Sequence, residues 1–381
     1  MNLFKAYFLE RVNRFVVKVR YEEKEVLAYL PNPGRLWEIL LPDTLLLLAR
    51  TKGPKYEFTV MASLKDSHPV LLHTHFTNRL VSNLISEKKI PFLANYQVMG
   101  TEPNVGQGRF DLLLKDRDTK ESFYLEVKTC TLFGSELAMF PDAETQRGTR
   151  HLYELLELKE KGVKAGLLFV VMNYSCNYFL PAYHIDRAFT EAFLKVYNES
   201  PIWAIAINLA QDLSTIADVK VLSIPIEYLR SVFADRGIYM LLVEMPRDEV
   251  IAIGKLGEIF FPKGFFIYVG SAMNGLSKRL KRYRGSIKNH HWHVDYLLER
   301  AILRKIIPVI TSSRLECQVA DGLSNIADSL IPHFGSSDCA CQSHLFYFQK
   351  NPLCNRDFIN LLNFFRLEVP TIQLKTFKES S

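Results

Sequence analysis

Two neighbouring segments carry residues that could do metal chemistry: Asp111 in the first, and Glu126 and Lys128 in the second. Apolar and polar residues alternate in both segments, which predicts strands whose side chains point to opposite faces in turn. If the strands are neighbours in one sheet, two carboxylates and an ammonium group surround one point. Close carboxylates repel unless a cation lies between them, and oxygen ligands suit Mg²⁺ or Mn²⁺. Such a trio would suit phosphodiester hydrolysis, with the lysine placing or deprotonating the attacking water.

The residues that alternate with this trio indicate which face of each strand is buried. They are apolar and are expected to lie in the core: Phe110, Leu112, Leu114, Phe123, Leu125 and Val127. Asp111 would then point away from the core, and Glu126 and Lys128 would emerge side by side. An ordinary glutamate–lysine pair on an exposed strand is the alternative interpretation.

Longer motifs surround the trio in a fixed order. They are Leu-Pro-Asn-Pro-Gly-Arg-Leu at 30–36, Arg-Phe-Asp at 109–111, Glu-Val-Lys-Thr-Cys-Thr-Leu at 126–132, Phe-Pro-Asp-Ala-Glu-Thr-Gln-Arg-Gly at 140–148 and His-Leu-Tyr-Glu-Leu at 151–155. The charged trio resembles the PD-(D/E)XK nuclease signature. Together the motifs closely resemble the sugar fermentation stimulation protein A family over roughly the first 230 residues. The resemblance implies Mg²⁺ on Asp111 and Glu126, with Lys128 positioning the water.

The same resemblance suggests roles for residues around the trio. It implies that Glu102, nine residues before the aspartate, is an additional metal ligand, and that the main-chain carbonyl of Val127 is another. Arg35 follows the Pro-Asn-Pro-Gly corner and has the reach to contact a phosphate. Asn32 and Gly34 are expected to serve the turn itself.

The helix expected after the Phe-Pro-Asp-Ala motif presents two basic side chains. Arg147 and His151 are at i and i+4, hence on one face, and could donate to a phosphate near the metal ion. The alternative is a helix that pairs internally through Glu144 and Glu154. Asp142 is expected to cap the start of this helix.

The strand pattern restarts near residue 236. Gly-Ile-Tyr at 237–239 opens one strand and Phe-Phe-Ile-Tyr-Val-Gly at 265–270 closes another, and Tyr-Val-Gly-Ser-Ala-Met, His-Trp-His-Val-Asp-Tyr and Phe-Gly-Ser-Ser-Asp-Cys begin at 268, 291 and 334. This part resembles the GIY-YIG nucleases, and more closely an uncharacterised GIY-YIG-related domain. The resemblance implies Tyr239 as general base, Tyr268 orienting the water, Arg279 against the phosphate and Glu316 on a divalent ion.

This second site departs from the family pattern. The late asparagine has no clear counterpart, the stretch between Tyr239 and Tyr268 is long, and three histidines follow the basic helix at 290, 291 and 293. Plain strand aromatics are the alternative interpretation of the two tyrosines. We therefore expect the first site to carry any cleavage.

Residues 278–293 form a basic segment with no acidic residue. Basic side chains neutralise phosphates and aromatic rings stack on bases. The candidate nucleic-acid contacts in this part are Tyr268, Lys278, Lys281, Arg282, Arg284, Lys288 and Trp292. The net charge of +6 comes wholly from the C-terminal part of the chain. Residues 1–235 hold 28 basic and 28 acidic residues, and residues 236–381 hold 19 and 13. A solvated charged face is the alternative.

Two cysteines near the end suggest a metal site of another kind. Cys339 and Cys341 precede His344, and His333 is the candidate for a fourth ligand. The Cys-x-Cys spacing is not that of a usual zinc knuckle, so zinc is not favoured. The other cysteines are interpreted as packing residues.

These side chains need a scaffold of strands and helices to position them. Short strands in the first 75 residues predict a small OB-like barrel. Helix, strands, helix and strand then predict a mixed α/β sheet over 76–230, with helices from Asn78 towards Pro91 and from Thr145 to Lys161. A GIY-YIG-like α+β domain over 236–354 and a C-terminal extension over 355–381 complete the chain.

Composition sets the cellular context that we expect. No apolar run is long enough to span a bilayer, no signal peptide is apparent, and six scattered cysteines do not form a disulfide framework, so we expect a cytoplasmic chain. We predict a Mg²⁺-dependent nuclease whose partner is nucleic acid, with DNA favoured over RNA. The alternative, which the family's name suggests, is a non-catalytic DNA-binding regulator of sugar (maltose) catabolism genes. A third possibility is an RNA or damaged-DNA substrate, and the sequence does not fix the oligomeric state.

Overall fold

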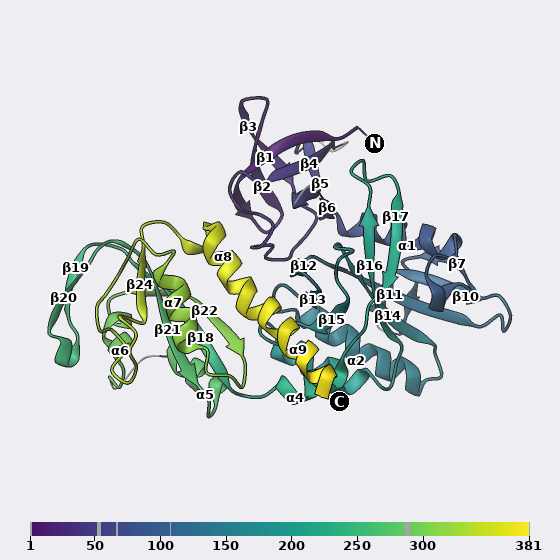
Figure 1. Cartoon of the computed structure of the whole chain (residues 1–381). Coiled ribbons are helices and arrows are strands. Elements are labelled where there is room, and N and C mark those ends of the chain that lie inside the picture. The colour runs from purple at the N-terminus through teal and green to yellow at the C-terminus, as the bar shows by residue number, and fades with distance from the viewer. Residues whose placement is uncertain (1, 52–54, 66–67, 107, 286–289, 381) are drawn as a thin grey trace. The chain divides into compact units, whose positions relative to one another are not determined.

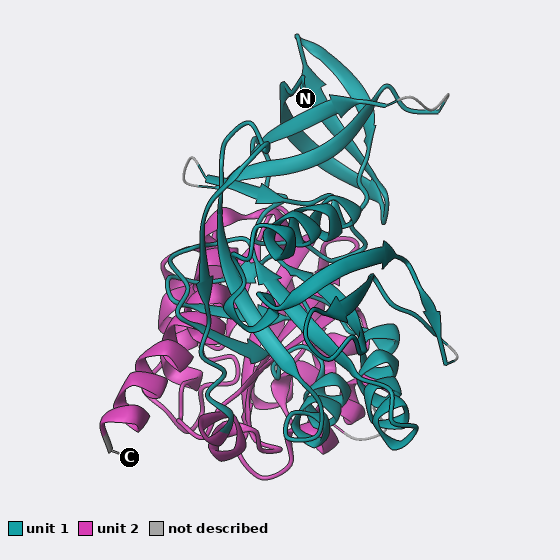
Figure 2. Ribbon diagram, turned by 90° about the vertical axis from the view of Figure 1, so that its right-hand side faces the viewer, with its two compact units in different colours: residues 1–226 teal, residues 227–381 magenta. Residues whose placement is uncertain are grey.

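The computed structural model describes residues 2–380, except 52–54, 66–67, 107 and 286–289, so the predicted contact Lys288 lies outside the described residues. The chain divides into two compact units, residues 1–226 and 227–381, which Figure 2 colours separately. Unit 1 contains a barrel and an α/β layer, and unit 2 is an α+β domain. The predicted fold class is confirmed.

The barrel occupies the N-terminal part of unit 1 (Figure 1). Its strands are β1 (Phe4–Asn13), β2 (Val16–Tyr21), β3 (Lys24–Tyr29), β4 (Leu45–Arg50), β5 (Phe58–Lys65) and β6 (His68–Leu71). They are ordered β3-β2-β1-β4-β5-β6, and a parallel pairing of β3 with β5 closes the ring. Closure leaves β1 to β5 without a free edge within the ring. This confirms the OB-like barrel that the short strands predicted.

A second sheet of mixed direction carries the charged trio. Its strands, in order across the sheet, are β17 (Ile216–Val221), β16 (Ile202–Leu209), β14 (Ala165–Val171), β11 (Ser122–Cys130), β10 (Leu112–Asp116) and β7 (Tyr96–Thr101). β11 pairs in parallel with β14 and antiparallel with β10. Every residue of β14 is buried, as expected for a central strand with both faces covered.

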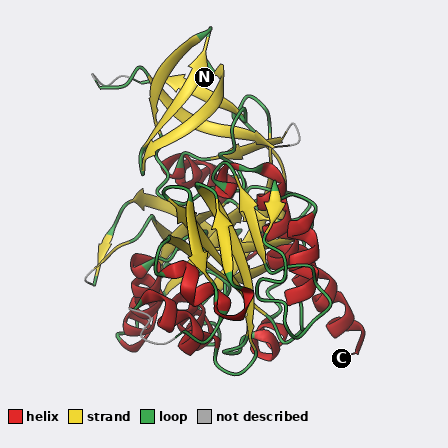
Figure 3. Ribbon diagram, turned by 90° about the vertical axis from the view of Figure 1, so that its left-hand side faces the viewer, coloured by secondary structure: helices red, strands yellow, loops and turns green. Residues whose placement is uncertain are grey.

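Helices and short strands complete the α/β layer of unit 1 (Figure 3). They are α1 (Thr74–Ser86), η1 (Pro91–Leu93), α2 (Gln146–Glu160), α3 (Arg187–Val196), the pair β8 (Asn104–Val105) and β9 (Gly108–Arg109), and the sheet of β12 (Leu132–Phe133), β13 (Leu137–Phe140) and β15 (Tyr178–Pro181). α1 begins before the predicted Asn78. Thr145, whose hydroxyl accepts from Gly148 N at 3.0 Å, caps α2 in place of the expected Asp142.

Unit 2 is built on a sheet ordered β22-β18-β21-β24-β23. Its strands are β18 (Gly237–Met245), β21 (Gly264–Ala272), β22 (Ile302–Ile310), β23 (Ser329–Leu330) and β24 (Leu345–Phe348). A hairpin of β19 (Glu249–Ala252) and β20 (Glu258–Phe261), with η2 (Gly254–Leu256) at its tip, lies between β18 and β21 in the chain. The hairpin accounts for the long stretch between Tyr239 and Tyr268.

The remaining elements of unit 2 are helical. They are α4 (Ile226–Val232), α5 (Leu276–Arg284), α6 (His293–Leu298), α7 (Glu316–Ser324), η3 (Pro352–Cys354), α8 (Arg356–Asn363), the π-helix η4 (Phe364–Glu368) and α9 (Val369–Ser380). Pro370 lacks an N–H and clashes with a regular helical turn before it, which accounts for the π turn between α8 and α9. Within the described residues, no helix has the length and apolar character needed to cross a membrane.

Candidate active site and a second cluster

Pairing of β10 with β11 brings the two carboxylates of the first site together. Leu112, the first residue of β10, lies opposite Leu125, and the N–H of Asp111 just before it donates to the carbonyl of Leu125 at 3.2 Å. Phe110, like the alternating leucines, is buried. Asp111 lies close enough to Glu126 for the charge of the glutamate to act on its pKa, and a shared sheet face for the two side chains stays a prediction.

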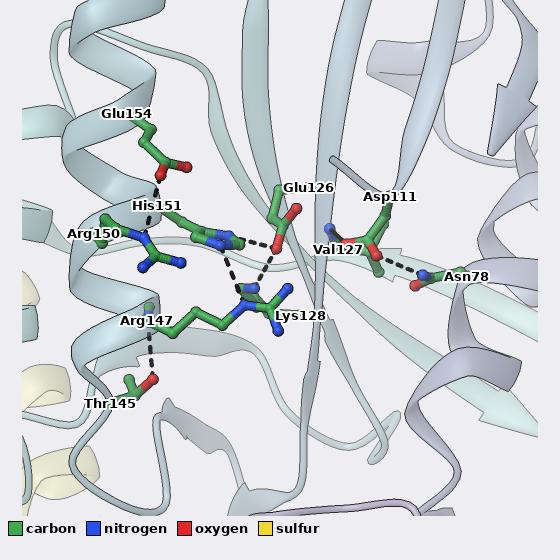
Figure 4. Close-up of polar contacts among 11 residues, drawn as sticks. Asn78, Asp111, Glu126, Val127, Lys128, Thr145, Arg147, Arg150, His151 and Glu154 are labelled. Carbon is green, nitrogen blue, oxygen red and sulfur yellow. Dashed lines mark hydrogen bonds and ion pairs between the residues drawn. The ribbon is translucent and has the colours of Figure 1, made fainter. Parts of the chain in front are cut away.

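Asp111 is held by two hydrogen bonds from its own unit (Figure 4). Asn78 Nδ2 of α1 donates to Oδ1 at 2.6 Å, and the main-chain N–H of Val127 donates to Oδ2 at 2.8 Å. Burial and the nearby charge of Glu126 nevertheless raise the pKa of Asp111 to about 6. The ionised form of Asp111 is therefore disfavoured in this position, and a bound cation would stabilise it.

Glu126 differs from its neighbour in exposure and in charge partners. Its side chain is 5% exposed, and Oε1 meets the ammonium group of Lys128 and, at 2.7 Å, Nδ1 of His151. Burial alone would raise the pKa of Glu126, but the charge of Lys128 and the His151 contact outweigh it and lower the pKa to about 2. We expected Glu126 to emerge at the surface. Instead His151, on α2, covers it, because α2 packs over this face of the sheet.

The contacts of His151 define its tautomer. Arg147 Nε lies 3.3 Å from His151 Nε2 and can only donate, so Nε2 accepts. A neutral ring then carries its proton on Nδ1 and donates it to Glu126. Figure 4 shows this chain from Arg147 through His151 to Glu126. His151 therefore orients the glutamate, and the exposed Arg147 remains the candidate for a phosphate contact.

The other predicted residues of this site lie further out. Glu102 is half-exposed and pairs with Arg109 at 3.3 Å. Arg35 stacks over the ring of Trp37 at 5.2 Å. Asp142 accepts from the N–H of Leu36 at 2.9 Å, and so connects the segment before α2 to the barrel corner.

The barrel corner itself is ordered as the sequence predicted. Asn32 Oδ1 accepts from the N–H of Gly34 at 2.9 Å, closing the turn. A Cβ at Gly34 would clash with a carboxylate oxygen of Asp142. Glycine is therefore needed at this position for the close approach of that carboxylate.

The groups around Asp111 have the chemistry of a divalent cation site. Each carboxylate oxygen has more than one lone pair, so the hydrogen bonds to Asp111 leave acceptor capacity. Within a strand, the N–H and C=O of one residue point to the same side, and the N–H of Val127 points at Asp111. Its carbonyl therefore faces the same side as the carboxylate. Two carboxylates and a carbonyl form the oxygen-rich ligand set that Mg²⁺ or Ca²⁺ prefers.

In unit 2 the four residues of the predicted second site also meet. Tyr239 and Tyr268 are buried, with ring centroids 6.5 Å apart, and Arg279 Nη1 lies 3.4 Å from the Tyr239 hydroxyl. Burial would raise the pKa of Glu316, but contacts that include His344 and the charge of Arg279 lower it. The Tyr239 hydroxyl also contacts that of Tyr283 at 2.9 Å.

The buried tyrosines also define what the neighbouring backbone must be. A Cβ at Gly270 would lie 2.5 Å from the Tyr239 hydroxyl oxygen, so this position on β21 requires glycine. Tyr268, at 4% exposure, offers no face for a base to stack on. That burial removes it from the predicted nucleic-acid contacts.

The basic segment divides into two kinds of residue. Lys278, Lys281 and Arg284 on α5 are exposed. Arg282 instead forms a two-pronged ion pair, with both distances 2.7 Å, to Asp295, which is fully buried. The ring of Trp292 lies 4.7 Å from this guanidinium and 3.9 Å from that of Arg279. Arg282 and Trp292 are thus engaged in the fold of unit 2, and the first three residues remain available for phosphate.

The cysteines near the end gather more closely than their spacing suggested. Ligand atoms of Cys317, Cys339, Cys341 and His344 all lie within 4.8 Å of one another. His333, the expected fourth ligand, is exposed and is not one of these clustered groups. Sequence reasoning missed Cys317 because it lies far from the Cys-x-Cys motif in the chain.

Comparisons with known families and proteins match three stretches of the chain. Residues 9–72 match the SfsA N-terminal OB domain, and residues 75–212 match the sugar fermentation stimulation protein RE domain. Residues 238–366 match a domain of unknown function, DUF123.

Individual relatives match between 51% and 58% of this chain. A sugar fermentation stimulation protein homolog from Clostridium tetani is 33% identical over 225 residues, which are 58% of this chain and 97% of the relative. A homolog from Saccharolobus solfataricus is 40% identical over 202 residues, 51% of this chain and 78% of the relative. The solved structure of Pyrococcus furiosus SfsA in complex with Ca²⁺ is 26% identical, with a TM-score of 0.54, and covers 58% of this chain and 96% of that one.

Proposed function

Because the chain belongs to the sugar fermentation stimulation protein family, we propose that unit 1 is a nuclease that binds DNA and hydrolyses phosphodiester bonds with a divalent cation. The observation that carries the proposal is that the Asp111 carboxylate accepts from the main-chain N–H of Val127 at 2.8 Å, beside Glu126, and that Lys128 contacts Glu126. A relative with the same fold was solved with Ca²⁺, which supports a divalent cation here. A protein that only bound DNA would gain nothing from carboxylates set against phosphate.

Each residue of the site has a role that follows from its chemistry. Asp111, Glu126 and the Val127 carbonyl would hold Mg²⁺ or Mn²⁺, which when bound stabilises charge on the phosphate and activates a water. Glu126 stays ionised because Lys128 and His151 contact its Oε1. The Lys128 ammonium has three donors, so beyond Glu126 it can hold a water or a phosphate oxygen.

Outer residues would bind the DNA backbone. The exposed guanidinium of Arg147, fixed through Nε on His151, is suited to a phosphate next to the metal ion. Arg35 at the barrel corner, and the barrel itself, offer further contacts to the nucleic acid. Glu102 would join the metal ligands only by leaving Arg109.

The test is cleavage of labelled single- and double-stranded DNA by the purified full chain, with Mg²⁺, Mn²⁺ or a chelator. We expect cleavage with either metal ion and none with the chelator. Lys128→Ala should abolish it, whereas Lys164→Ala, which removes an exposed lysine paired with Glu121, should not. DNA binding without cleavage under every metal condition would contradict the nuclease and favour the second candidate.

That second candidate is a non-catalytic DNA-binding regulator of sugar catabolism genes. The specific observation in its favour is that Glu126 Oε1 is already engaged by Lys128 and His151, an arrangement that can be purely structural. It predicts sequence-selective DNA binding that neither metal ions nor chelators change. Binding to operator and random DNA, each with and without Mn²⁺, separates the two candidates.

A further inference from the structure

The cluster of three cysteines and a histidine in unit 2 is built from two separate segments. Cys317 lies in the first turn of α7, and Cys339, Cys341 and His344 lie in the loop that leads to β24. His344 is 2% exposed, and its Nε2 lies 3.4 Å from the Sγ of Cys339. Folding therefore brings a soft, sulfur-rich set of groups to one point.

We propose that Cys317, Cys339, Cys341 and His344 bind one structural Zn²⁺ ion. Zinc–sulfur and zinc–nitrogen bonds of about 2.3 and 2.0 Å place the ligand atoms of a tetrahedron about 3.5 to 3.8 Å apart. The 3.4 Å separation of Cys339 and His344, and the 4.8 Å limit for the whole set, need only small side-chain shifts to reach that geometry. Four protein ligands close the coordination sphere, so the ion is structural.

The choice of ion follows from the donors. Thiolates and an imidazole select Zn²⁺ over Mg²⁺ or Ca²⁺, which prefer oxygen. A disulfide is the competing use of close thiols. It would consume two sulfurs and leave the third cysteine and the buried His344 without a reason to converge. All three cysteines are free thiols in the structure.

The second nitrogen of His344 extends the site to Glu316. His344 Nδ1 lies 3.3 Å from Glu316 Oε1, an ion-pair distance without the direction of a hydrogen bond. A histidine that binds zinc through Nε2 donates its Nδ1–H to an outer acceptor, commonly a carboxylate. The proposal thus makes Glu316 a positioning residue for His344. This differs from the divalent-ion ligand that the family resemblance implied.

Zinc content of the full chain tests the proposal directly. The protein is purified under reducing conditions without chelator, and its metals are measured by mass spectrometry. We expect about one zinc ion per chain. Cys317→Ser should lose it, whereas Cys354→Ser, which changes an exposed cysteine of η3 outside the cluster, should keep it. Zinc retained in full by Cys317→Ser would overturn the ligand set.

A second measurement needs no variant, and so does not depend on a variant's folding. Alkylation of the wild-type chain, mapped on peptides, should spare Cys317, Cys339 and Cys341 and modify Cys354. Removing zinc with a chelator should expose the three to alkylation. No zinc after purification and after incubation with Zn²⁺ and reductant, or a disulfide among the three, would overturn the proposal.

The role of Glu316 in positioning His344 is tested by the zinc affinity of a variant. Glu316→Gln should still bind zinc, about 10- to 100-fold more weakly in competition with a chromophoric chelator. An unchanged affinity would overturn the assignment of Glu316 to His344. All these readouts measure metal at unit 2, so they are independent of whether unit 1 cleaves DNA.

Discussion

Each unit contains a glutamate that contacts Nδ1 of a buried histidine, and the two pairs differ in the group that lies at the other ring nitrogen. In unit 1, His151 contacts Glu126 through Nδ1 and accepts from Arg147 at Nε2. In unit 2, His344 faces Glu316 through Nδ1 and Cys339 through Nε2. The group at the far nitrogen decides which member of the pair can bind a metal ion. In unit 1 a guanidinium occupies the far nitrogen, so the glutamate is the candidate metal ligand. In unit 2 a thiol lies at the far nitrogen, so the histidine is the candidate metal ligand.

The comparison is sharpest in the response to removal of a glutamate charge. Glu126→Gln removes an anionic ligand at almost constant shape, so we expect DNA cleavage to fall by orders of magnitude while binding survives. Glu316→Gln should have a much smaller effect on total cleavage. Single-turnover rates on one DNA substrate with Mn²⁺ measure both. Cleavage that persists in Glu126→Gln but vanishes in Glu316→Gln would reverse the ranking of the units.

Unit 2 is expected to depend more than unit 1 on one ion pair. Arg282→Ala leaves the carboxylate of Asp295 buried without its cation, which costs about 3 kcal/mol in the free energy of unfolding. This is the lower end for such pairs, because the arginine side chain is 28% exposed. Hydrogen exchange of unit 2 peptides against urea measures the loss. The control is Arg284→Ala on the same helix, and equal stability of the two variants would contradict the structural role.

His151 provides the matching test in unit 1. His151→Ala removes the donor that orients Glu126, so we expect divalent-cation affinity to fall by about 10- to 100-fold. Calorimetric titration with Mn²⁺ measures it. Arg150→Ala, on the same helix but paired at 3.3 Å with Glu154, is the matched control and should bind as the wild type does. A wild-type affinity in His151→Ala would show that Lys128 alone is sufficient.

The sequence predicted those parts of the sites that depend on local periodicity. Alternation along the two segments was enough to predict the neighbouring strands β10 and β11, and the structure places Asp111 against the N–H of Val127 beside Glu126. The barrel and the mixed sheet followed from the same pattern. His151 was assigned to the correct helix but to the wrong surroundings, because its burial depends on how α2 packs on the sheet. Cys317 was missed because only tertiary folding brings α7 to the loop before β24.

The two carboxylates of unit 1 should give metal binding a defined pH dependence. Asp111 has a pKa of about 6 and Glu126 of about 2, so between these values Asp111 is the one of the two carboxylates that exchanges a proton. Mn²⁺ must displace that proton below pH 6, and its affinity should fall about tenfold per pH unit there and level off above.

The stability of the metal-free chain should change with pH in the opposite direction to the metal affinity. A raised pKa in the folded state stabilises the metal-free chain most below the unfolded value of 3.8, and this contribution is lost as the pH rises through 6. Titrations at several pH values and melting curves without metal measure the two effects. Asp111→Asn should remove both pH dependences. A pH dependence that persists in this variant would assign the proton to another group.

The smallest expected effect concerns the exposed face of α5. Arg284 is exposed and, unlike Arg282, is not part of the pair with Asp295. If it contacts a phosphate, Arg284→Ala should weaken DNA binding equally on all sequences and reduce the slope of log affinity against log salt by about one unit. Fluorescence anisotropy at several salt concentrations measures that slope. An unchanged slope would identify α5 as a solvated basic face and leave DNA binding to unit 1, where Arg147→Ala should then produce the larger change.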